Sequence, residues 1–567
     1  MSKIIECVPN FSEGTDQTKI NSIVSSIKSI QGVTVLDCDP GLDTNRTVVT
    51  FVGDPESVVE AAFQGIKCAS ELIDMSQHKG THPRIGATDV CPIIPVNGVS
   101  IEECIEYSII LAKKVGRELN IPVYLYEKSA ISPRRENLAS IREGEYEGLE
   151  QKLKDKNWKP DFGPIRFNKS AGATVIGCRE FLIAYNINLN TTDKRLATDI
   201  AFEIREAGRS KRKKNPNSSN LLDGEIIRHK NGSPIKVPGK FKCVKAIGWY
   251  VSEYNRAQIS INFTNYKISP IHQVFDAVCG LAVERGLRVT GSELVGLVPK
   301  SALVEAGKYY LKKQGRSLGI SESDIIECAV QSLGLNDVSK FNTKEKIIEF
   351  AIKDDKDSLL HLSTDDLIYS ISQNSPAPGG GSVSALAGSL GAALLSMVSL
   401  LTYDKKEYFN RRTKMSRFGE MAHNYQKRLN ELVDEDTYAF NNAMNASRLP
   451  GEAKSEIKFK KQELFKAYKI ATDTPLEIAI ISLEIIKLSI DLIKYGNPNS
   501  VTDAHVAAEV GLAGVRGGCV NVMINLSSFD KISDYDANIE EKIEGLLKES
   551  KKLHKKAYTL TKKIIKE

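Results

Sequence analysis

The sequence lacks most of the features that would place it in a specialised class of protein. Its ten cysteines form no Cys-x-x-Cys pair, which argues against a zinc ribbon, a redox motif or a disulfide framework. The net charge is only +6 against 77 basic and 71 acidic side chains, so composition gives no case for nucleic acid. No basic leader followed by an apolar run opens the chain, and we therefore expect reduced thiols and a cytoplasmic location.

What is present is the composition of a globular protein, with 41% hydrophobic and 26% charged residues. At 567 residues the chain exceeds the size of one hydrophobic core, so we expect three or four domains. Residues 375–403 contain no charge and are long enough to cross a bilayer. Serine, glycine and alanine dilute their leucines and valines, so we predict a helix inside the protein and no membrane partner.

A loop at residues 78–89 concentrates groups that can do acid–base chemistry, with the sequence His-Lys-Gly-Thr-His-Pro-Arg-Ile-Gly-Ala-Thr-Asp. Its glycine and proline disfavour the helix that a zinc site at His78 and His82 would need, so no metal is predicted. We predict that His82 transfers protons, that Arg84 binds a carboxylate and that Asp89 orients the imidazole. The competing interpretation is a surface loop whose histidines only bond to backbone groups.

Hydrophobic periodicity predicts two α+β lobes in the first half of the chain. Up to about residue 96 the order is β-α-β-β-α-β, followed by a helix, a strand and a helix at 142–155. The same order recurs between residues 181 and 294 without a residue-by-residue repeat. Two such units indicate a duplicated ferredoxin-like fold with a ligand crevice between the lobes. The strand-end loops of the first unit are expected to bring four polar residues near His82: Asn10, Asp37, Asp39 and Arg46.

Two polar segments interrupt this order. Residues 160–174 combine prolines and glycines with Arg, Asn, Lys and Ser, and they suit a flat polar ligand and a plain linker equally well. Residues 209–240 contain the run Lys-Arg-Lys-Lys. A solvated loop is the favoured interpretation of this run, because no aromatic residues lie between the charges as a nucleic-acid surface would require.

From about residue 322 the pattern is helical throughout. A glycine-rich sequence at 379–382 precedes a helix N-terminus, where an anion can bind, but the lysine of a phosphate loop is missing. Small residues recur at four-residue spacing and predict a close helix–helix contact: Ser384, Gly388, Ala392 and Ser396. Asp434 and Asp436 lie on an otherwise apolar helix, where burial would raise a carboxyl pKa and create an acid. On the residues alone, a surface acidic patch is favoured.

Further helices are predicted at 418–446, 456–471, 473–494, 502–526 and 539–567. A new helix is expected at residue 473 because Asp-Thr-Pro is a helix-start signal. The last helix is rich in lysine around its apolar positions, which predicts a solvated outer face.

Longer motifs resemble two known families. Four of them resemble the glutamate formiminotransferase family: Val-Pro-Asn-Phe-Ser-Glu-Gly at 8–14, the loop at 82–89, Gly-Ala-Thr at 172–174 and Ala-Ile-Gly-Trp-Tyr at 246–250. Three resemble the formiminotetrahydrofolate cyclodeaminase family: residues 375–402, Leu-Val-Asp-Glu-Asp at 432–436 and Asn-Val-Met-Ile-Asn-Leu at 521–526. Their order is that of the bifunctional formimidoyltransferase-cyclodeaminase family and covers nearly the whole chain.

The resemblance implies two linked steps of histidine degradation. The formimino group of N-formimino-L-glutamate would pass to tetrahydrofolate, a co-substrate expected to be polyglutamylated, and the product would close to 5,10-methenyltetrahydrofolate with loss of ammonia. The alternative is formyl transfer, with the helical half serving mainly oligomerisation. A homo-oligomer is also implied. The expected divisions are an N-terminal lobe at 1–179, a C-terminal lobe at 180–335, a linker at 336–360 and a helical domain at 361–567.

The resemblance also implies site residues. The catalytic residues of the two families correspond to His82 and Asp436. For Asp436, this correspondence replaces the interpretation as part of a surface acidic patch. Folate binding falls on one segment: Gly163, Pro164, Ile165, Arg166, Phe167, Asn168, Lys169, Ser170, Ala171 and Gly172. Position and chemistry add Asn10, Arg84 and Asp89 as substrate-binding residues, and six candidates in the helical half: Gly380, Gly381, Ser382, Asp503, Asn521 and Asn525. No substrate-contacting residue is assigned in the basic segment 209–240.

Overall fold

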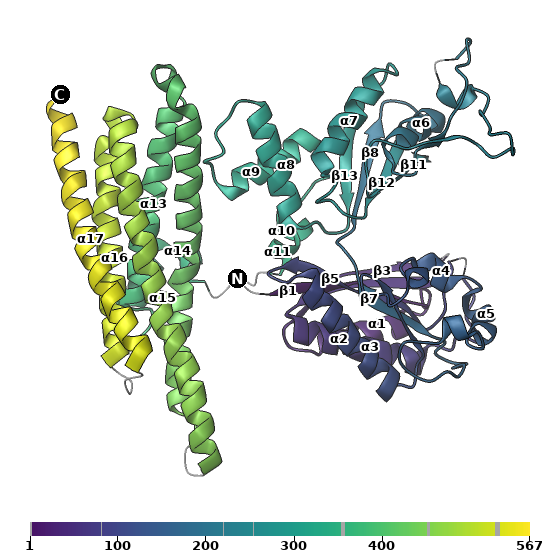
Figure 1. The fold of residues 1–567 in the computed structure, drawn as a ribbon, viewed down its shortest axis with the longest axis horizontal. Coiled ribbons are helices and arrows are strands. Elements are labelled where there is room, and N and C mark those ends of the chain that lie inside the picture. The colour runs from purple at the N-terminus through teal and green to yellow at the C-terminus, as the bar shows by residue number, and fades with distance from the viewer. Residues whose placement is uncertain are drawn as a thin grey trace. The chain divides into compact units, whose positions relative to one another are not determined.

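The computed structural model describes residues 3–567 except 43, 81, 219, 253, 353–357, 451–453 and 528–532. The chain divides into two compact units (Figure 1). The first comprises Met1–Ala306 and Val330–Lys353, and the second comprises Gly307–Ala329 and Asp354–Glu567. The first unit contains the sheets and the second is built from helices, as the change of sequence pattern predicts.

The first lobe has a mixed sheet of seven strands. Its elements are β1 (Ile4–Cys7), β2 (Asn10–Phe11), α1 (Gln17–Lys28), β3 (Val33–Gly41), β4 (Arg46–Gly53), α2 (Pro55–Leu72), β5 (Thr88–Asn97), α3 (Ile101–Glu118), β6 (Val123–Glu127) and β7 (Thr174–Cys178). Antiparallel pairing runs β3-β4-β1-β5, and β7 and β6 extend the sheet in parallel beside β5. The first strands and helices follow the predicted β-α-β-β-α-β order, with the two-residue strand β2 added between β1 and α1.

The three helices of this lobe begin where the sequence supplies caps. The Asp16 side chain accepts hydrogen bonds from the first turn of α1, and Asp54 does so for α2, which continues with Pro55. Ser100 and Glu103 form a capping box at α3. Apolar residues of the sheet and of these helices form one core, and other residues of β5, β6 and β7 form a second with α4 (Leu138–Arg142) and α5 (Glu145–Lys152). The polar strand-end loops lie at the edge of the sheet.

The second lobe has a four-stranded antiparallel sheet in the order β11-β12-β8-β13. Its elements are β8 (Ile183–Leu189), α6 (Lys194–Ile204), β11 (Val244–Val251), β12 (Arg256–Phe263), α7 (Ile271–Val283) and β13 (Val289–Val295). The second-third-first-fourth strand order is the one that β3-β4-β1-β5 has in the first lobe. The repeat of element order predicted from sequence is therefore also a repeat of strand order.

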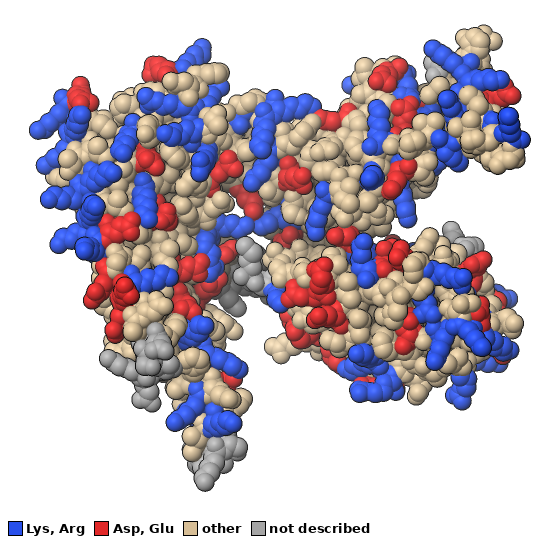
Figure 2. All heavy atoms as spheres, in the orientation of Figure 1, with Lys and Arg blue, Asp and Glu red and all other residues tan. Residues whose placement is uncertain are grey.

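The basic segment 209–240 forms an insertion between α6 and β11. The short strands β9 (Arg209–Ser210) and β10 (Lys236–Val237) pair within it, and two isolated bridges join Arg212 to Ile226 and Arg228 to Pro234. The segment holds nine Lys or Arg and two Asp or Glu, and Figure 2 shows basic side chains outnumbering acidic ones on this part of the second lobe. Its net charge of +7 exceeds the +6 of the whole chain, so the remainder of the protein is close to neutral.

Several elements differ from the sequence prediction. The helix expected at 142–155 is two short helices, α4 (Leu138–Arg142) and α5 (Glu145–Lys152). Gly144 separates them because it takes φ +84°, outside the helical region. Strand β7 and helix α8 (Lys300–Lys313) were missed. The five residues of β7 follow directly on a glycine-rich segment, which hides a strand that short.

The helical unit is built on five long helices: α13 (Gly380–Tyr403), α14 (Arg412–Ser447), α15 (Lys454–Tyr495), α16 (Val501–Ser527) and α17 (Ser533–Lys566). Their apolar faces form one core. The predicted close approach along α13 is present, because a side chain at Gly388 would lie 2.8 Å from Ser482 Oγ. Figure 2 shows many basic side chains along α17, on the outer side of the bundle. Ile543 is buried on the opposite face.

Within the part of the chain that the structure describes, two helices are long and apolar enough to cross a membrane by length and composition, Gly380–Tyr403 and Pro498–Ser527. In these helices 56% and 50% of the most apolar window is buried inside the structure. Both contribute residues to the core of the helical unit, which is the environment predicted for the uncharged stretch.

Helix α15 corrects the prediction of two separate helices at 456–471 and 473–494, because it runs unbroken with Pro475 inside it. Proline has no N–H, so the carbonyl of Ala471 loses its normal partner within the helix. The side-chain amide of Asn525, on α16, donates a hydrogen bond to that carbonyl. The neighbouring helix thus compensates for the proline and keeps α15 continuous.

Residues 307–329, which precede the predicted boundary at 335, belong to the helical unit by their contacts. The Tyr403 hydroxyl donates to the Gly315 carbonyl at 2.9 Å, and Leu318 N–H donates to Ser416 Oγ at 3.0 Å. A side chain at Gly319 would lie 2.6 Å from the Cα of Gly419. The loop between α8 and α9 (Glu322–Leu333) therefore packs on α13 and α14.

Candidate active sites

The turn between β3 and β4 holds the His82 loop at the edge of the first sheet. Asn45, with φ +47°, accepts a hydrogen bond from Gly14 N–H at 2.9 Å and donates one to the Lys79 carbonyl at 2.8 Å. Its own carbonyl accepts from Nε2 of His78 at 2.9 Å. Sequence reasoning missed Asn45. The sequence feature that could have indicated it is an asparagine between two strand patterns, because asparagine tolerates the left-handed conformation of a turn.

His82 is half-buried, and both of its ring nitrogens are engaged. A guanidinium nitrogen of Arg46 lies 2.9 Å from Nε2, and Nδ1 lies 2.8 Å from the Pro83 carbonyl. Because a guanidinium can only donate, Nε2 carries the lone pair and Nδ1 carries the proton. Burial lowers the pKa of His82, and the positive charges of Arg46 and Arg142 lower it further. The ring is therefore neutral and basic near pH 7.

Arg84 is buried and already neutralised. Its guanidinium pairs with Glu147 at 2.7 Å and with Glu145 at 2.9 Å, and its Nε donates to Nδ1 of His78 at 3.2 Å. An open hollow of ≈ 480 Å³ lies over this group, lined by His78, Lys79, Gly80, Arg84, Gly144, Glu145 and Glu147. Arg84 thus fixes the loop to α5, and a substrate carboxylate would have to displace two acidic side chains to reach it.

Asp89 is also buried and forms an ion pair with Arg142. Its other oxygen accepts a hydrogen bond from Ile85 N–H at 3.0 Å. Asp89 therefore orients Arg142 and the loop backbone, whereas Arg46 and Pro83 orient the imidazole that Asp89 was expected to hold. Asn10 lies on β2 between β4 and β5, where its side chain donates to the Val8 carbonyl at 3.2 Å.

The predicted folate-binding segment runs along the same sheet edge as the His82 loop. At one end Gly163 lies against Ile121 where α3 meets β6, and a side chain there would overlap the Ile121 carbonyl. At the other end Gly172, with φ +69°, forms a bridge with Gly86. Backbone bonds from Met75 N–H to Ser170 O, from Ala87 N–H to Ala171 O and from Ala173 N–H to Ile85 O join the segment to the loop. The structure brings the two predicted groups together.

Within that segment side chains fix part of the backbone, and five residues are exposed. Asn168 accepts from Ala171 N–H at 3.0 Å, and the Phe167 ring lies 5.4 Å from that of Tyr146. The exposed residues are Gly163, Ile165, Arg166, Lys169 and Ser170. Both cationic side chains of the segment therefore face solvent on the outer side of this edge.

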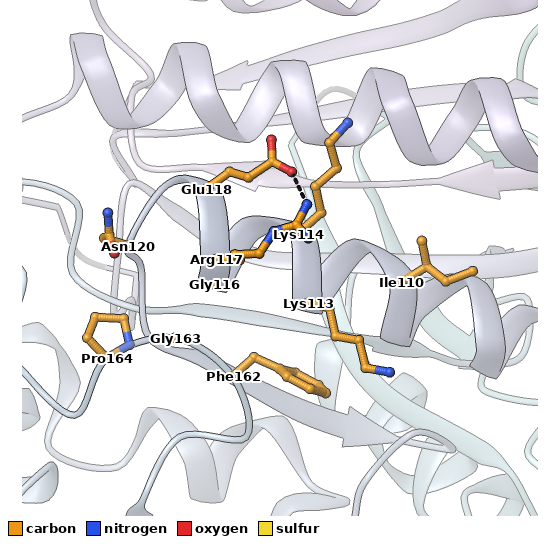
Figure 3. Close-up of a pocket in the computed structure, with 10 residues that line it drawn as sticks. All are labelled: Ile110, Lys113, Lys114, Gly116, Arg117, Glu118, Asn120, Phe162, Gly163 and Pro164. Atoms are coloured by element: carbon orange, nitrogen blue, oxygen red, sulfur yellow. Dashed lines mark hydrogen bonds and ion pairs between the residues drawn. The ribbon is translucent and has the colours of Figure 1, made fainter.

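A hollow of ≈ 760 Å³ opens where the segment meets the end of α3 (Figure 3). It is lined by Ile110, Lys113, Lys114, Gly116, Arg117, Glu118, Asn120, Phe162, Gly163 and Pro164. Lys114 pairs with Glu60 at 2.5 Å, and Arg117 pairs with Glu118 at 2.7 Å. The hollow joins apolar surface to cationic side chains, a combination suited to an organic anion.

In the helical unit, Asp436 on α14 faces the N-terminus of α13. A side chain at Gly381 would overlap the Asp436 carboxylate, so only glycine permits this approach. Ser382 Oγ donates to the Val433 carbonyl at 2.8 Å and lies 3.3 Å from Asp436 Oδ2. Burial raises the pKa of Asp436, while hydrogen bonds from the backbone and side chain of Ser382 oppose that rise. The carboxyl is thus displaced toward its protonated form.

The remaining candidates of the helical half separate into two groups. Gly380 lies beside Asn521, because a side-chain carbon added to this glycine would be 3.3 Å from the amide nitrogen of Asn521; both residues therefore belong to the Asp436 site. Asp503 lies on the same helix as Asn521 but 18 residues away, which is about 27 Å along α16. Asn525 is bonded to Ala471 of α15. Asp434 accepts from Leu359 N–H at 2.9 Å and from Ser358 Oγ at 2.7 Å.

Among the residues that the structure describes, no group of three or more His, Cys, Asp or Glu side chains is arranged to hold a metal ion. Each site contains one candidate for proton transfer, the His82 imidazole in the first and the Asp436 carboxyl in the second. One is placed beside arginines and the other beside hydroxyl and amide groups.

Comparisons with known proteins cover the chain in three consecutive parts. Residues 4–179 match the formiminotransferase domain, N-terminal subdomain, residues 184–353 match the formiminotransferase domain, and residues 363–561 match the family described as formiminotransferase-cyclodeaminase. The formimidoyltransferase-cyclodeaminase of Mus musculus is 41% identical over 554 residues, which is 97% of each chain.

Two shorter relatives match the halves separately. The glutamate formimidoyltransferase of Streptococcus pyogenes serotype M1 is 41% identical over 312 residues, covering 55% of this chain and 94% of the relative. The methenyltetrahydrofolate cyclohydrolase of Methylorubrum extorquens is 32% identical over 192 residues, covering 34% of this chain and 92% of the relative.

Proposed function

Because the chain belongs to the formimidoyltransferase-cyclodeaminase family, we propose that it catalyses two consecutive folate-dependent steps of histidine degradation. The first transfers the formimino group of N-formimino-L-glutamate to tetrahydrofolate. The second cyclises 5-formiminotetrahydrofolate to 5,10-methenyltetrahydrofolate and releases ammonia. The observation that carries this proposal is the match of both halves, in order, over 97% of the chain to a formimidoyltransferase-cyclodeaminase.

In the first step N5 of tetrahydrofolate attacks the formimino carbon, and the bond from that carbon to the glutamate nitrogen breaks. We assign His82 as the group that takes the proton from N5 and returns one to the departing nitrogen. Its neutral state supports this role, because a protonated imidazole could not accept the first proton. The Gly163–Gly172 segment, joined to the same loop, supports a folate head placed beside His82.

In the second step N10 of the folate attacks the same carbon, and the former imino nitrogen leaves as ammonia. Ammonia leaves only when its nitrogen is protonated, so the step needs an acid. We assign Asp436 to that role, with Ser382 and Asn521 beside it as substrate-contacting groups. The raised pKa of Asp436 supports the role, because a larger fraction of the carboxyl is protonated near neutrality.

Assays with the purified full chain test both steps. With tetrahydrofolate and N-formimino-L-glutamate, methenyltetrahydrofolate absorbance and ammonia should rise together in equal amounts. With N-formyl-L-glutamate as donor, no product is expected. Product from the formyl donor without ammonia would replace this proposal by formyl transfer, with the helical half reduced to oligomerisation.

We further propose that the co-substrate is polyglutamylated and that its tail lies toward the hollow at the end of α3. Lys113, which is exposed, and the apolar wall of Phe162 support this position (Figure 3). Replacing Lys113 by glutamate should raise the KM for a pentaglutamate folate more than the KM for the monoglutamate. Equal changes in the two constants would reject this position for the tail.

For the protein as a whole, we propose a cytoplasmic homo-oligomer without a resident metal, in which the two lobes are copies of one ferredoxin-like unit. The shared strand order supports the duplication. Exposed apolar residues along α13 support association with a second copy: Val383, Leu390, Met397 and Leu401. Light scattering tests the oligomer, and activity after dialysis against a chelator tests the absence of a metal.

A further inference from the structure

Arg46 differs from the other arginines around the first site. Arg84 is neutralised by Glu145 and Glu147, and Arg142 is neutralised by Asp89. Arg46 is half-buried at the start of β4 and forms no ion pair within the described part of the chain. Its one side-chain hydrogen bond there is the 2.9 Å contact with Nε2 of His82.

Asp89 and Asp39 favour the charge of Arg46 without bonding to it directly. A partly desolvated guanidinium that no carboxylate contacts is an unfavourable arrangement unless a ligand supplies the bonded anion. The donor substrate of the proposed reaction, N-formimino-L-glutamate, carries two carboxylates. The planar fork of arginine suits a carboxylate because it donates two parallel hydrogen bonds. Arg84, selected from sequence for this task, has its fork filled by acidic side chains of α5.

The contact between Arg46 and His82 also has a chemical consequence. While the guanidinium donates to Nε2, the lone pair that would take a proton from tetrahydrofolate is occupied. Nδ1 cannot substitute, because it carries its own proton toward the Pro83 carbonyl. The imidazole is thus in the correct protonation state but blocked, and Arg46 must move before proton transfer.

We propose that Arg46 binds a carboxylate of N-formimino-L-glutamate, and that this exchange of partners releases Nε2 of His82 for proton transfer. The inference rests on the proposed transfer reaction and names the specificity-determining residue of its site. The donor substrate thereby activates its own base. A folate that arrives without the donor meets a blocked imidazole, which prevents unproductive proton transfer.

The charged groups facing His82 predict a second effect of the exchange. Arg46 from β4 and Arg142 from α4 lower the pKa of His82, while Asp89 from β5 raises it. A substrate carboxylate seated on Arg46 would cancel part of the positive charge and raise that pKa. The histidine then becomes a stronger base at the moment when its lone pair is exposed.

Kinetics of the full-length enzyme test the binding role. Arg46→Gln should raise the KM for N-formimino-L-glutamate by about 10- to 100-fold, since a charge-assisted bond is lost, and should leave the KM for tetrahydrofolate within twofold. Arg46→Lys should lie between the two. Arg134→Gln, an exposed arginine of the same lobe, is the matched control and should behave as the wild type.

Truncated donors identify the carboxylate. N-formimino-4-aminobutyrate lacks the α-carboxylate and N-formimino-2-aminobutyrate lacks the γ-carboxylate. With one of the two, wild type and Arg46→Gln should become equally slow, because the contact is missing from both reactions. If the variant keeps its full defect with both analogues, or if its KM for the complete donor is unchanged, Arg46 does not bind the substrate carboxylate.

A measurement without turnover separates this inference from the proposed function. In protein labelled at histidine nitrogens, with His82→Ala identifying the signal, the pKa of His82 should be higher in Arg46→Gln than in the wild type. Saturating glutamate should raise the pKa in the wild type and leave that of the variant unchanged. Equal pKa values in the two ligand-free proteins would overturn the inference, whereas a wild type that cannot use the formimino donor would overturn the proposed function alone.

Discussion

Burial acts on the proposed proton-transfer group of each site, and it shifts the pKa of the two groups in opposite directions. Burial disfavours the charged form of any side chain, so it lowers the pKa of His82 and raises the pKa of Asp436. A neutral imidazole is a base, and a neutral carboxyl is an acid. The first step needs a base for the folate nitrogen and the second needs an acid for ammonia. With His82 and Asp436 in their proposed roles, one effect acting on two residue types would serve both reactions.

The sites differ in what surrounds that group. His82 lies on an edge loop held by long-range contacts to a turn and to a neighbouring segment, with arginines beside it. Asp436 lies between packed helices, beside Gly381 and Ser382 at the start of α13, with Asn521 of α16 in the same site. A loop site can exchange partners when substrate binds, whereas a bundle site depends on the fixed distance between helices. Perturbing each site should expose this difference.

Replacing His82 or Asp436 should have the largest effect on the rate of the corresponding reaction. His82→Ala should reduce formimino transfer by about 10²- to 10⁴-fold, the usual contribution of a positioned acid–base group, and leave cyclisation of supplied 5-formiminotetrahydrofolate intact. Asp436→Asn should do the converse. Separate assays of the two reactions, with circular dichroism to confirm folding, check both. A folded variant that keeps the targeted reaction would remove that residue from its role.

A single methyl group should break the bundle site. Gly381→Ala would overlap the Asp436 carboxylate, which must then rotate away from Ser382 and from the substrate. We expect cyclisation to fall by about 10- to 100-fold while transfer is unchanged. The matched control is Gly545→Ala on α17, where an added side-chain carbon meets nothing within 4 Å. Undiminished cyclisation in the Gly381 variant would show that Asp436 needs no fixed position.

The kcat/KM values of the two reactions should depend on pH in opposite directions. His82 must be deprotonated to act, so kcat/KM for transfer falls as pH drops through a pKa that burial and Arg46 place below that of an ordinary histidine. Asp436 must be protonated, so kcat/KM for cyclisation falls as pH rises through a pKa above that of an ordinary aspartate. Profiles of the separate steps check this. Limbs of the same sign would contradict the acid and base assignments.

A smaller effect, on stability, is expected from removing the hydrogen bond between Asn525 and the Ala471 carbonyl of α15. Asn525→Ala leaves the Ala471 carbonyl without a donor and should lower the free energy of unfolding of the helical unit by about 1–3 kcal/mol. In a Pro475→Ala background the helix regains its own N–H, and the same substitution should cost much less. Denaturant unfolding of the four proteins gives the coupling energy. Equal costs in both backgrounds would mean that Asn525 does not compensate for the proline.

How much was predictable depended on the distance along the chain between interacting residues. Helices α1, α2 and α3 occur in the order that hydrophobic periodicity predicts, because this periodicity and the caps at the helix starts depend on neighbouring residues. Strand-end topology anticipated Arg46 beside His82. The engagement of Arg84 with Glu145 and Glu147 was not predicted, since these partners lie more than sixty positions away on a helix whose start was misplaced. Asn45 was missed for the same reason.

The sequence by itself determined which groups could act. Local patterns established an all-helical second half, a polar loop around His82 and a glycine-rich start of α13, because periodicity, capping and turn chemistry are properties of neighbouring residues. Only the tertiary structure decided which charges meet. It paired Arg84 and Arg142 with carboxylates and left Arg46 on the imidazole. It also showed that Asn525, a candidate site residue, donates its hydrogen bond to the Ala471 carbonyl of α15. Ion pairs and hydrogen bonds depend on distances that the fold creates between residues far apart in the chain.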